Sequence, residues 1–275
     1  VTVNGGQGYV ATLDLLSFSQ QGRLKKELGN NPWDWHGILS YIAQIVRRET
    51  ESSASVINLA KHEPEPDGGW IVDGFFRGNA PFVMFGDGGE GKSTLLMALL
   101  ASISTGTEII PGIKPIKTGN VLYCDWEQSE DDAANLELEI AKGAGIDKPD
   151  IVYVRMSSPF VDNVEFIKGV VKEHDIAATV YDSVVGASGD DVKDDISAQA
   201  FFQGLREIGV PSMLVMHVTK ENTNKPYGNS YYYNFARGCW KVEGSRLDNG
   251  NGIHVEMFNT KMSRGVASPS ALGPF

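Results

Sequence analysis

The sequence contains the run Gly86-Asp87-Gly88-Gly89-Glu90-Gly91-Lys92-Ser93-Thr94, which fits the pattern G-x-x-x-x-G-K-[ST] in full. Residues 81–85 before this run have the pattern of a buried strand, and residues 95–100 after it continue as an apolar helix. In this setting the backbone N–H groups of the glycine-rich turn converge on phosphates, and the helix dipole adds positive potential. The sequence therefore predicts that residues 86–94 bind a nucleoside triphosphate, which we take to be ATP.

Two side chains of the run have separate expected tasks. Lys92 would supply a mobile positive charge to the phosphates, and the hydroxyl of Ser93 would hold Mg²⁺. A glycine-rich turn between a strand and a helix can also be purely structural, but a lysine and a hydroxyl in register favour nucleotide binding. We therefore expect ATP and Mg²⁺ as cofactors.

Composition limits the class of protein. The chain has 275 residues, of which 41% are hydrophobic, enough for one large α/β domain with or without a smaller appendage. Its net charge of −11 argues against binding nucleic acid by bulk electrostatics, although local loops can still do so. No apolar run approaches the roughly 18 residues of a membrane span, and residues 1–8 do not have the pattern of a signal peptide. With only two cysteines, these features predict a cytoplasmic protein without membrane contact.

The chain is expected to have two parts. Residues 1–66 have the composition of an arm or linker, with one amphipathic helix from Asp34 to about residue 46. The apolar stripe of that helix would pack either on its own core or on a neighbouring subunit. Prolines and glycines between residues 62 and 69 indicate the boundary, so residues 67–275 would form the second domain.

In that second domain, strands alternate with helices, which predicts an α/β fold with a mostly parallel sheet whose ligands bind at the carboxyl ends of the strands. Near the C-terminus, the turn signal at residues 248–252 predicts antiparallel strands that extend this sheet. The expected strands after the phosphate-binding run cover residues 120–127, 151–154, 177–181, 212–216, 238–243 and 253–258, and the expected helices cover 129–143, 163–174 and 196–208.

Acidic residues end two of these strands. Asp182 follows an apolar strand and would orient the magnesium shell, unless it merely caps the next turn. Glu127 ends the neighbouring strand, residues 120–127, and is the candidate to orient and deprotonate the attacking water, the alternative being a solvated acid. His217 ends a third strand, where it would sense the γ-phosphate or be an ordinary core histidine.

Residues from Lys220 to Tyr233 are expected to form a loop, and this loop combines cations with aromatic rings, as channels for single-stranded nucleic acid do. The candidate nucleic-acid residues are Lys220, Lys225, Tyr231 and Arg237. Tyrosine runs also occur in core strands and protein interfaces, and the loop 186–195 is acidic, which argues against DNA.

Basic residues after the core strands are candidates for an arginine finger, which stabilises charge on the transferring phosphoryl group and is often supplied by an adjacent subunit. Arg264 and Lys261 are the first candidates, ahead of Arg237. The alternative is a surface salt bridge, the commoner fate of an arginine.

Taken together, residues 70–265 resemble the RecA-like ATPases, in particular the RepA- and DnaB-type hexameric helicases of plasmids and phages. The matching runs are residues 86–94, 125–127, 180–183, 217–220, 228–230, 236–237 and 259–261. The resemblance implies a three-layer RecA fold, ATP bound between the subunits of a hexameric ring, Glu127 as the catalytic carboxylate and Lys261 with Arg264 acting on the neighbour's nucleotide. In that family the basic pair is commonly K-x-R, whereas here two residues separate Lys261 from Arg264.

The sequence thus predicts a Mg²⁺-dependent ATPase that forms a ring and translocates on single-stranded DNA as a replicative helicase in a bacterial or phage-infected cell. An upstream primase-like domain or partner would fit this function. Two alternatives remain: a strand-exchange recombinase that forms a filament, and a regulatory ATPase that acts on protein partners.

Overall fold

Seven strands form the central sheet, in the order β5-β4-β6-β7-β3-β8-β9. The computed structural model describes residues 57–63, 69–78, 81–189, 192–219, 223–247 and 252–262. The strands of the sheet are β3 (Pro81–Gly86), β4 (Asn120–Asp125), β5 (Ile151–Arg155), β6 (Ile176–Asp182), β7 (Ser212–His217), β8 (Gly238–Arg246) and β9 (Ile253–Met262). All pairings among the first six strands are parallel, and β9 pairs antiparallel to β8. This arrangement confirms the predicted α/β fold with a mostly parallel sheet.

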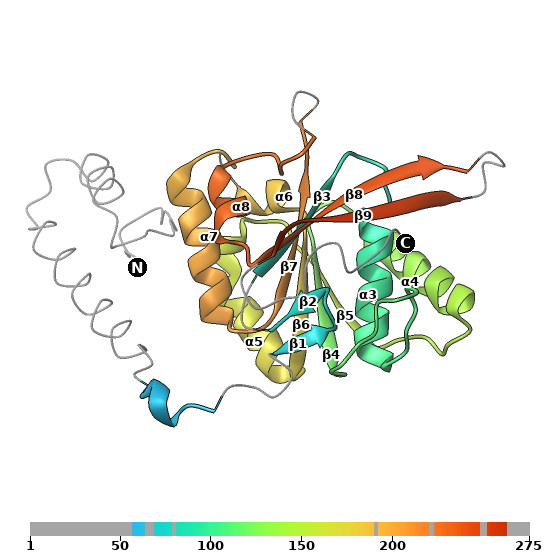
Figure 1. Cartoon of the computed structure of the whole chain (residues 1–275), viewed down its shortest axis with the longest axis horizontal. Coiled ribbons are helices and arrows are strands. Elements are labelled where there is room, and N and C mark those ends of the chain that lie inside the picture. Colours follow the sequence, from blue (N-terminus) through green and yellow to red (C-terminus); the bar gives the residue numbers. More distant parts are fainter. Residues whose placement is uncertain are drawn as a thin grey trace, which may run out of the picture. The chain divides into compact units, whose positions relative to one another are not determined.

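Helices cover both faces of this sheet. One face carries α3 and α4, and the other carries α5, α6, α7 and α8 (Figure 1). Their bounds are α3 Lys92–Thr105, α4 Glu130–Ala144, α5 Val164–Glu173, α6 Val184–Ser188, α7 Asp195–Ile208 and α8 Ser230–Phe235, with a 3₁₀ turn η2 at Phe160–Asn163 before α5. A separate two-stranded ribbon, β1 (Trp70–Val72) with β2 (Phe76–Arg77), precedes β3.

Because both faces are covered, the central strands are apolar at consecutive positions instead of alternating. In β3, Val83 and Phe85 pack on the side of α7, while Phe82 and Met84 pack on the side of α3. All four side chains are at most 1% exposed. The six parallel strands therefore form a tightly packed layer, and this layer can hold the polar side chains at their carboxyl ends in fixed positions.

The predicted antiparallel pairing near the C-terminus is confirmed between β8 and β9, while β8 itself pairs parallel to β3. Two local expectations are corrected by the structure. Residues 230–235 form the helix α8 and not part of a loop, because the Asn229 side chain accepts a hydrogen bond from the Tyr231 N–H and caps the first turn. The segment after Asp182, expected as a loop, contains the short helix α6.

The chain divides into two units, Val1–Pro64 and Glu65–Phe275. In the first, the structure describes residues 57–63, where Leu59–Lys61 form a 3₁₀ turn, η1, capped by the side chain of Asn58. The amphipathic helix predicted from Asp34 lies outside the described residues. None of the described helices has both the length and the apolar character needed to cross a membrane.

Candidate functional site

The turn between β3 and α3 is a phosphate-binding loop by its backbone geometry. Gly89 and Gly91 have φ angles of 78° and 81°, in a region of backbone conformation that residues other than glycine rarely adopt. A hydrogen bond within the loop stabilises this conformation: the Asp87 N–H donates to the Glu90 carboxylate at 2.5 Å. Gly91 precedes the first turn of α3 and no side chain caps this turn, so the N–H groups at the helix start can bind an anion.

Lys92, the first residue of α3, folds back into this loop. Its side chain is buried, with 6% exposed, and Nζ donates to the carbonyl oxygens of Gly86 at 3.1 Å and Asp87 at 2.5 Å. Burial lowers the pKa of Lys92, while the nearby carboxylates of Glu90 and Asp182 oppose that shift. The ammonium is thus held inside the loop by carbonyl oxygens that phosphate oxygens can replace.

Ser93 and Asp182 lie directly beside this loop. The Ser93 hydroxyl donates to Asp182 Oδ2 at 2.7 Å, joining the start of α3 to the end of β6. Asp182 is only 3% exposed, and burial raises its pKa even though the hydrogen bonds from Tyr123 and Ser93 act in the opposite direction. A hydroxyl and a carboxylate are oxygen ligands of the kind that Mg²⁺ prefers.

This pair fits Mg²⁺ bound together with a nucleotide. Magnesium is usually held by one or two protein oxygens, with phosphates and water completing its shell. Within the described residues no group of three or more His, Cys, Asp or Glu side chains is arranged to hold a metal. Ser93 and Asp182 therefore fit a metal whose remaining ligands come from phosphate and water.

Glu127 lies just beyond the end of β4, with 43% of its side chain exposed. Its Oε1 accepts a hydrogen bond from the hydroxyl of Ser183 and lies 3.5 Å from Nε2 of His217. The His217 interaction is the largest cause of a lowered Glu127 pKa; Ser183 and the charge of Lys92 add to it, and partial burial opposes it. The carboxylate is therefore ionised and open to solvent, as a general base must be.

The turn that carries Glu127 is anchored by its neighbours. Asp125, fully buried, accepts hydrogen bonds on Oδ1 from the N–H groups of Glu127 at 2.7 Å and Gln128 at 3.0 Å. Trp126 donates its indole N–H to the Ser158 carbonyl at 2.9 Å, and its backbone N–H to the Asp182 carbonyl at 2.7 Å. These bonds fix the direction in which the Glu127 side chain leaves the sheet.

The structure thus brings the predicted site residues to one edge of the sheet: Lys92, Ser93, Glu127, Asp182 and His217. At this edge β3 and β7 lie side by side, with Gly86 of β3 opposite His217 of β7. Sequence reasoning missed Tyr123 and Ser183, whose hydroxyls donate to Asp182 and Glu127. Ser183 directly follows Asp182 in the sequence, a signal that was available.

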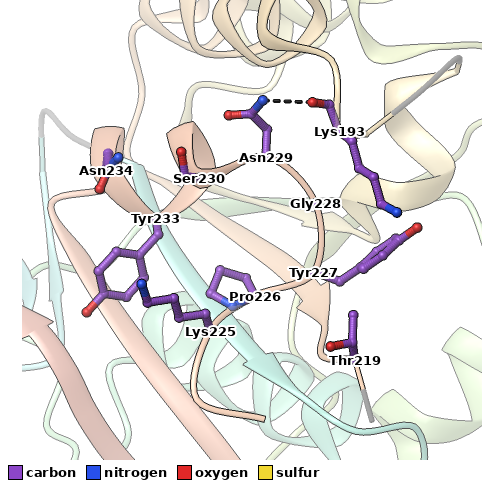
Figure 2. A pocket seen from close by; sticks show the side chains of 10 residues that line it. All are labelled: Lys193, Thr219, Lys225, Pro226, Tyr227, Gly228, Asn229, Ser230, Tyr233 and Asn234. Atoms are coloured by element: carbon purple, nitrogen blue, oxygen red, sulfur yellow. Dashed lines mark hydrogen bonds between the residues drawn. The ribbon is translucent and has the colours of Figure 1, made fainter. Parts of the chain in front are cut away.

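The candidate nucleic-acid residues are brought together only in part. A cavity of about 370 Å³ lies beside the loop before α8, and Lys225 lines it (Figure 2). Its other lining residues are Lys193, Thr219, Pro226, Tyr227, Gly228, Asn229, Ser230, Tyr233 and Asn234. Sequence reasoning missed Lys193, whose ammonium lies 5.2 Å from the centre of the Tyr227 ring.

Tyr231 and Arg237 do not line this cavity. The Tyr231 ring stacks on Phe235, one turn further along α8, with centroids 4.8 Å apart. Arg237 is exposed just before β8, and its N–H donates to the Pro81 carbonyl at 2.8 Å. Lys220 lies outside the described residues.

Of the two first finger candidates, Lys261 is engaged within its own chain. Its Nζ donates to the carbonyl oxygens of Tyr233 and Asn234 at the end of α8, both at 2.7 Å, and lies 5.4 Å from the centre of the Tyr233 ring. Burial lowers the pKa of Lys261. Arg264 lies outside the described residues.

Comparison with known proteins agrees with this site. Residues 46–223 match the family model described as AAA domain, which is more than half of the chain, so the chain belongs to this family. The match contains the phosphate-binding loop, Glu127, Asp182 and His217, and it ends before β8. A search of curated proteins found no match.

A solved structure supports the fold. The crystal structure of a KaiC-like protein from the hyperthermophilic archaeon Pyrococcus horikoshii OT3 is similar with a TM-score of 0.50. The similarity covers 72% of this chain and 85% of that protein at 17% sequence identity, and it bears on the fold alone. Family, fold and loop together define a P-loop ATPase with a RecA-like fold, a class that implies nucleotide binding.

Proposed function

We propose that the protein hydrolyses ATP with Mg²⁺ and that Glu127 is the general base. The observation that carries this proposal is the position of the Glu127 carboxylate beyond β4, where Oε1 accepts a hydrogen bond from Ser183 and lies 3.5 Å from Nε2 of His217. Without such a carboxylate, the loop would account for nucleotide binding but not for hydrolysis.

In the proposed reaction, Glu127 orients a water molecule and takes its proton as the water oxygen bonds to the γ-phosphorus. The bond from that phosphorus to the β–γ bridging oxygen breaks, and ADP and phosphate are the products. Lys92 moves from the carbonyls of Gly86 and Asp87 to the phosphate oxygens, where it balances their charge. Ser93 and Asp182 would hold the Mg²⁺, which neutralises charge on the β- and γ-phosphates when bound.

His217 fits the role of a γ-phosphate sensor in this reaction. It ends β7 beside the phosphate-binding loop, and its carbonyl accepts a hydrogen bond from Tyr227 N–H at 2.7 Å. A shift of His217 would therefore act on Glu127 on one side and on the lining of the cavity on the other.

We further propose that the ATPase works as a ring, hexameric as in the RepA- and DnaB-type helicases, and moves along single-stranded DNA. The cavity supports this proposal, because lysines that follow phosphates and rings that stack on bases are what single-strand binding needs. Lys225, Lys193 and Tyr227 supply that chemistry. A neighbouring subunit would contribute Arg264, for which Lys261 is the less available alternative because it already binds α8.

A regulatory ATPase that acts on protein partners is the second candidate. The net charge of −11 favours it, since a strongly acidic chain repels nucleic acid except at local loops. A strand-exchange recombinase that forms an open filament would share the same fold and site, but it would bind DNA cooperatively along its length and show no directional unwinding.

Three measurements test the proposal. Lys92→Ala should abolish ATP turnover, while Lys142→Ala on the exposed side of α4 should leave it unchanged; intact turnover in Lys92→Ala would refute the mechanism.

Retention on single-stranded DNA with an ATP analogue, over a salt series, should show an affinity that falls as salt rises. No retention at low salt would favour the regulatory ATPase, and particle images would distinguish a ring from a filament.

A further inference from the structure

The carboxylate of Asp182 has a second hydroxyl donor, which the proposed reaction does not use. Tyr123 donates its phenolic hydroxyl to Asp182 Oδ2 at 2.7 Å, the same oxygen and the same distance as the bond from Ser93. Two hydroxyls therefore converge on one oxygen of the carboxylate expected to hold Mg²⁺.

The sheet places Tyr123 under the site. β4 and β6 are parallel neighbours, with Tyr123 opposite Val180 and Asp125 opposite Asp182. Since side chains alternate along a strand, Tyr123 and Asp182 lie on the face covered by α3. The Tyr123 ring is fully buried and packs at 54° to the ring of Tyr153, with centroids 5.9 Å apart.

The two hydroxyl donors, Ser93 and Tyr123, lie on different elements of the structure. Ser93 lies at the junction of the phosphate-binding loop and α3, and its hydroxyl is itself an expected metal ligand. Tyr123 lies inside the central strand β4, and its hydroxyl is not an expected metal ligand. Because the terminal torsion of an aspartate is broad, the plane of the carboxylate is set mainly by its hydrogen bonds.

We propose that Tyr123 is a positioning residue that holds the Asp182 carboxylate in the plane required for Mg²⁺ with ATP. The proposal rests on the function proposed above. It assigns to the phenol the support that a residue behind a metal ligand provides, which is to fix the ligand's orientation.

Burying a tyrosine ring in this protein does not by itself require such a bond. Tyr232 is also fully buried, on the other face of the sheet, and its hydroxyl has no hydrogen-bond partner among the described residues. Tyr232→Phe is therefore a matched control for Tyr123→Phe: each change removes one buried hydroxyl, but only one of these hydroxyls contacts Asp182.

The test is the binding of a fluorescent ATP analogue, measured in EDTA and over a Mg²⁺ titration. For Tyr123→Phe we expect an unchanged affinity in EDTA and a half-saturating Mg²⁺ concentration raised about 10-fold, the lower end of what loss of support behind a metal ligand costs. Tyr232→Phe should titrate like the unchanged protein. Equal Mg²⁺ curves for Tyr123→Phe and the unchanged protein would overturn the proposal.

A second arm asks whether the effect passes through Asp182. In an Asp182→Asn background, adding Tyr123→Phe should change the Mg²⁺ curve less than twofold, because coupled residues are not additive. A full 10-fold effect in that background would assign Tyr123 a general packing role and refute the inference. Thermal unfolding without metal checks that each variant is folded. If the unchanged protein shows no Mg²⁺-dependent ATP binding, the proposed function fails instead.

Discussion

Nε2 of His217 lies 3.5 Å from Oε1 of Glu127, although β7, which ends at His217, and β4, which ends two residues before Glu127, are not neighbours. β6 lies between β4 and β7 in the sheet, and Ser183, which follows β6, donates to the same Oε1. The ends of three successive strands therefore converge on one carboxylate oxygen. This convergence connects the proposed base to β7, and through the His217 carbonyl to Tyr227 in the lining of the cavity.

Replacing His217 by Ala should move the acid limb of the ATPase pH profile to higher pH. His217 is the largest cause of the lowered Glu127 pKa, so its loss lets that pKa rise toward its ordinary value. Glu127 then takes up a proton at a higher pH, and activity as the base is lost earlier as the pH falls. Turnover measured over an acidic pH series at saturating ATP and Mg²⁺ checks this; an unchanged acid limb would contradict it.

Glu127→Gln should stop turnover without preventing nucleotide binding. The amide keeps the size of the side chain and can still accept from Ser183, but it cannot take a proton from water. We expect turnover to fall about 10²- to 10⁴-fold, the usual contribution of a general base, with ATP affinity within about twofold. Glu130→Gln, an exposed acid in the first turn of α4, is the control and should retain full turnover.

The convergence of the site residues was predictable from the sequence because parallel strands end at the same edge of a sheet. A strand followed by Asp182, another by Glu127 and a third by His217 therefore had to bring these side chains to one edge. Tyr123 was not predictable in the same way, since a tyrosine inside an apolar strand has the pattern of a core residue. Its bond to Asp182 depends on the register of β4 against β6, which no local pattern determines.

Two further features of the fold could not be predicted from the sequence: the short helix α8 and the pairing of β8 with β3. α8 has six residues, too few for a helical period to show, so the sequence pattern predicts a loop at its tyrosines. The turn signal between β8 and β9 indicates that these two strands are antiparallel to each other. This signal does not predict how β8 pairs with β3. That pairing is parallel and joins segments that are far apart in the sequence.

Gly186→Ala should disturb the Glu127 turn from the neighbouring helix. A Cβ at Gly186 in α6 would lie 2.7 Å from the Cβ of Trp126, closer than real contacts allow. We expect a loss of stability of about 1–3 kcal/mol, typical of overpacking, together with reduced turnover as Trp126 shifts. Urea unfolding and ATP turnover measure the two effects.

The matched control for this substitution is Gly169→Ala in α5, where nothing lies within 4 Å of the added Cβ. It should keep full turnover and leave stability unchanged or raise it by up to about 1 kcal/mol, because alanine favours a helix interior. If Gly186→Ala behaved like Gly169→Ala, the close packing of α6 on Trp126 would not position the base.

Lys261→Met and Arg264→Ala should separate a role within the chain from a role across subunits. Lys261 joins β9 to the end of α8 by two hydrogen bonds, so its loss should lower the free energy of unfolding by about 1.5–3 kcal/mol, the range for hydrogen bonds that involve a charged group. Arg264→Ala should leave that free energy unchanged but abolish turnover if Arg264 acts on a neighbour's nucleotide.

Mixing Arg264→Ala with Glu127→Gln protein should then restore part of the turnover, because a Glu127→Gln subunit can supply its arginine to a neighbour with an intact base. Two inactive variants that stay inactive when mixed, under conditions where subunits exchange, would contradict a site shared between subunits.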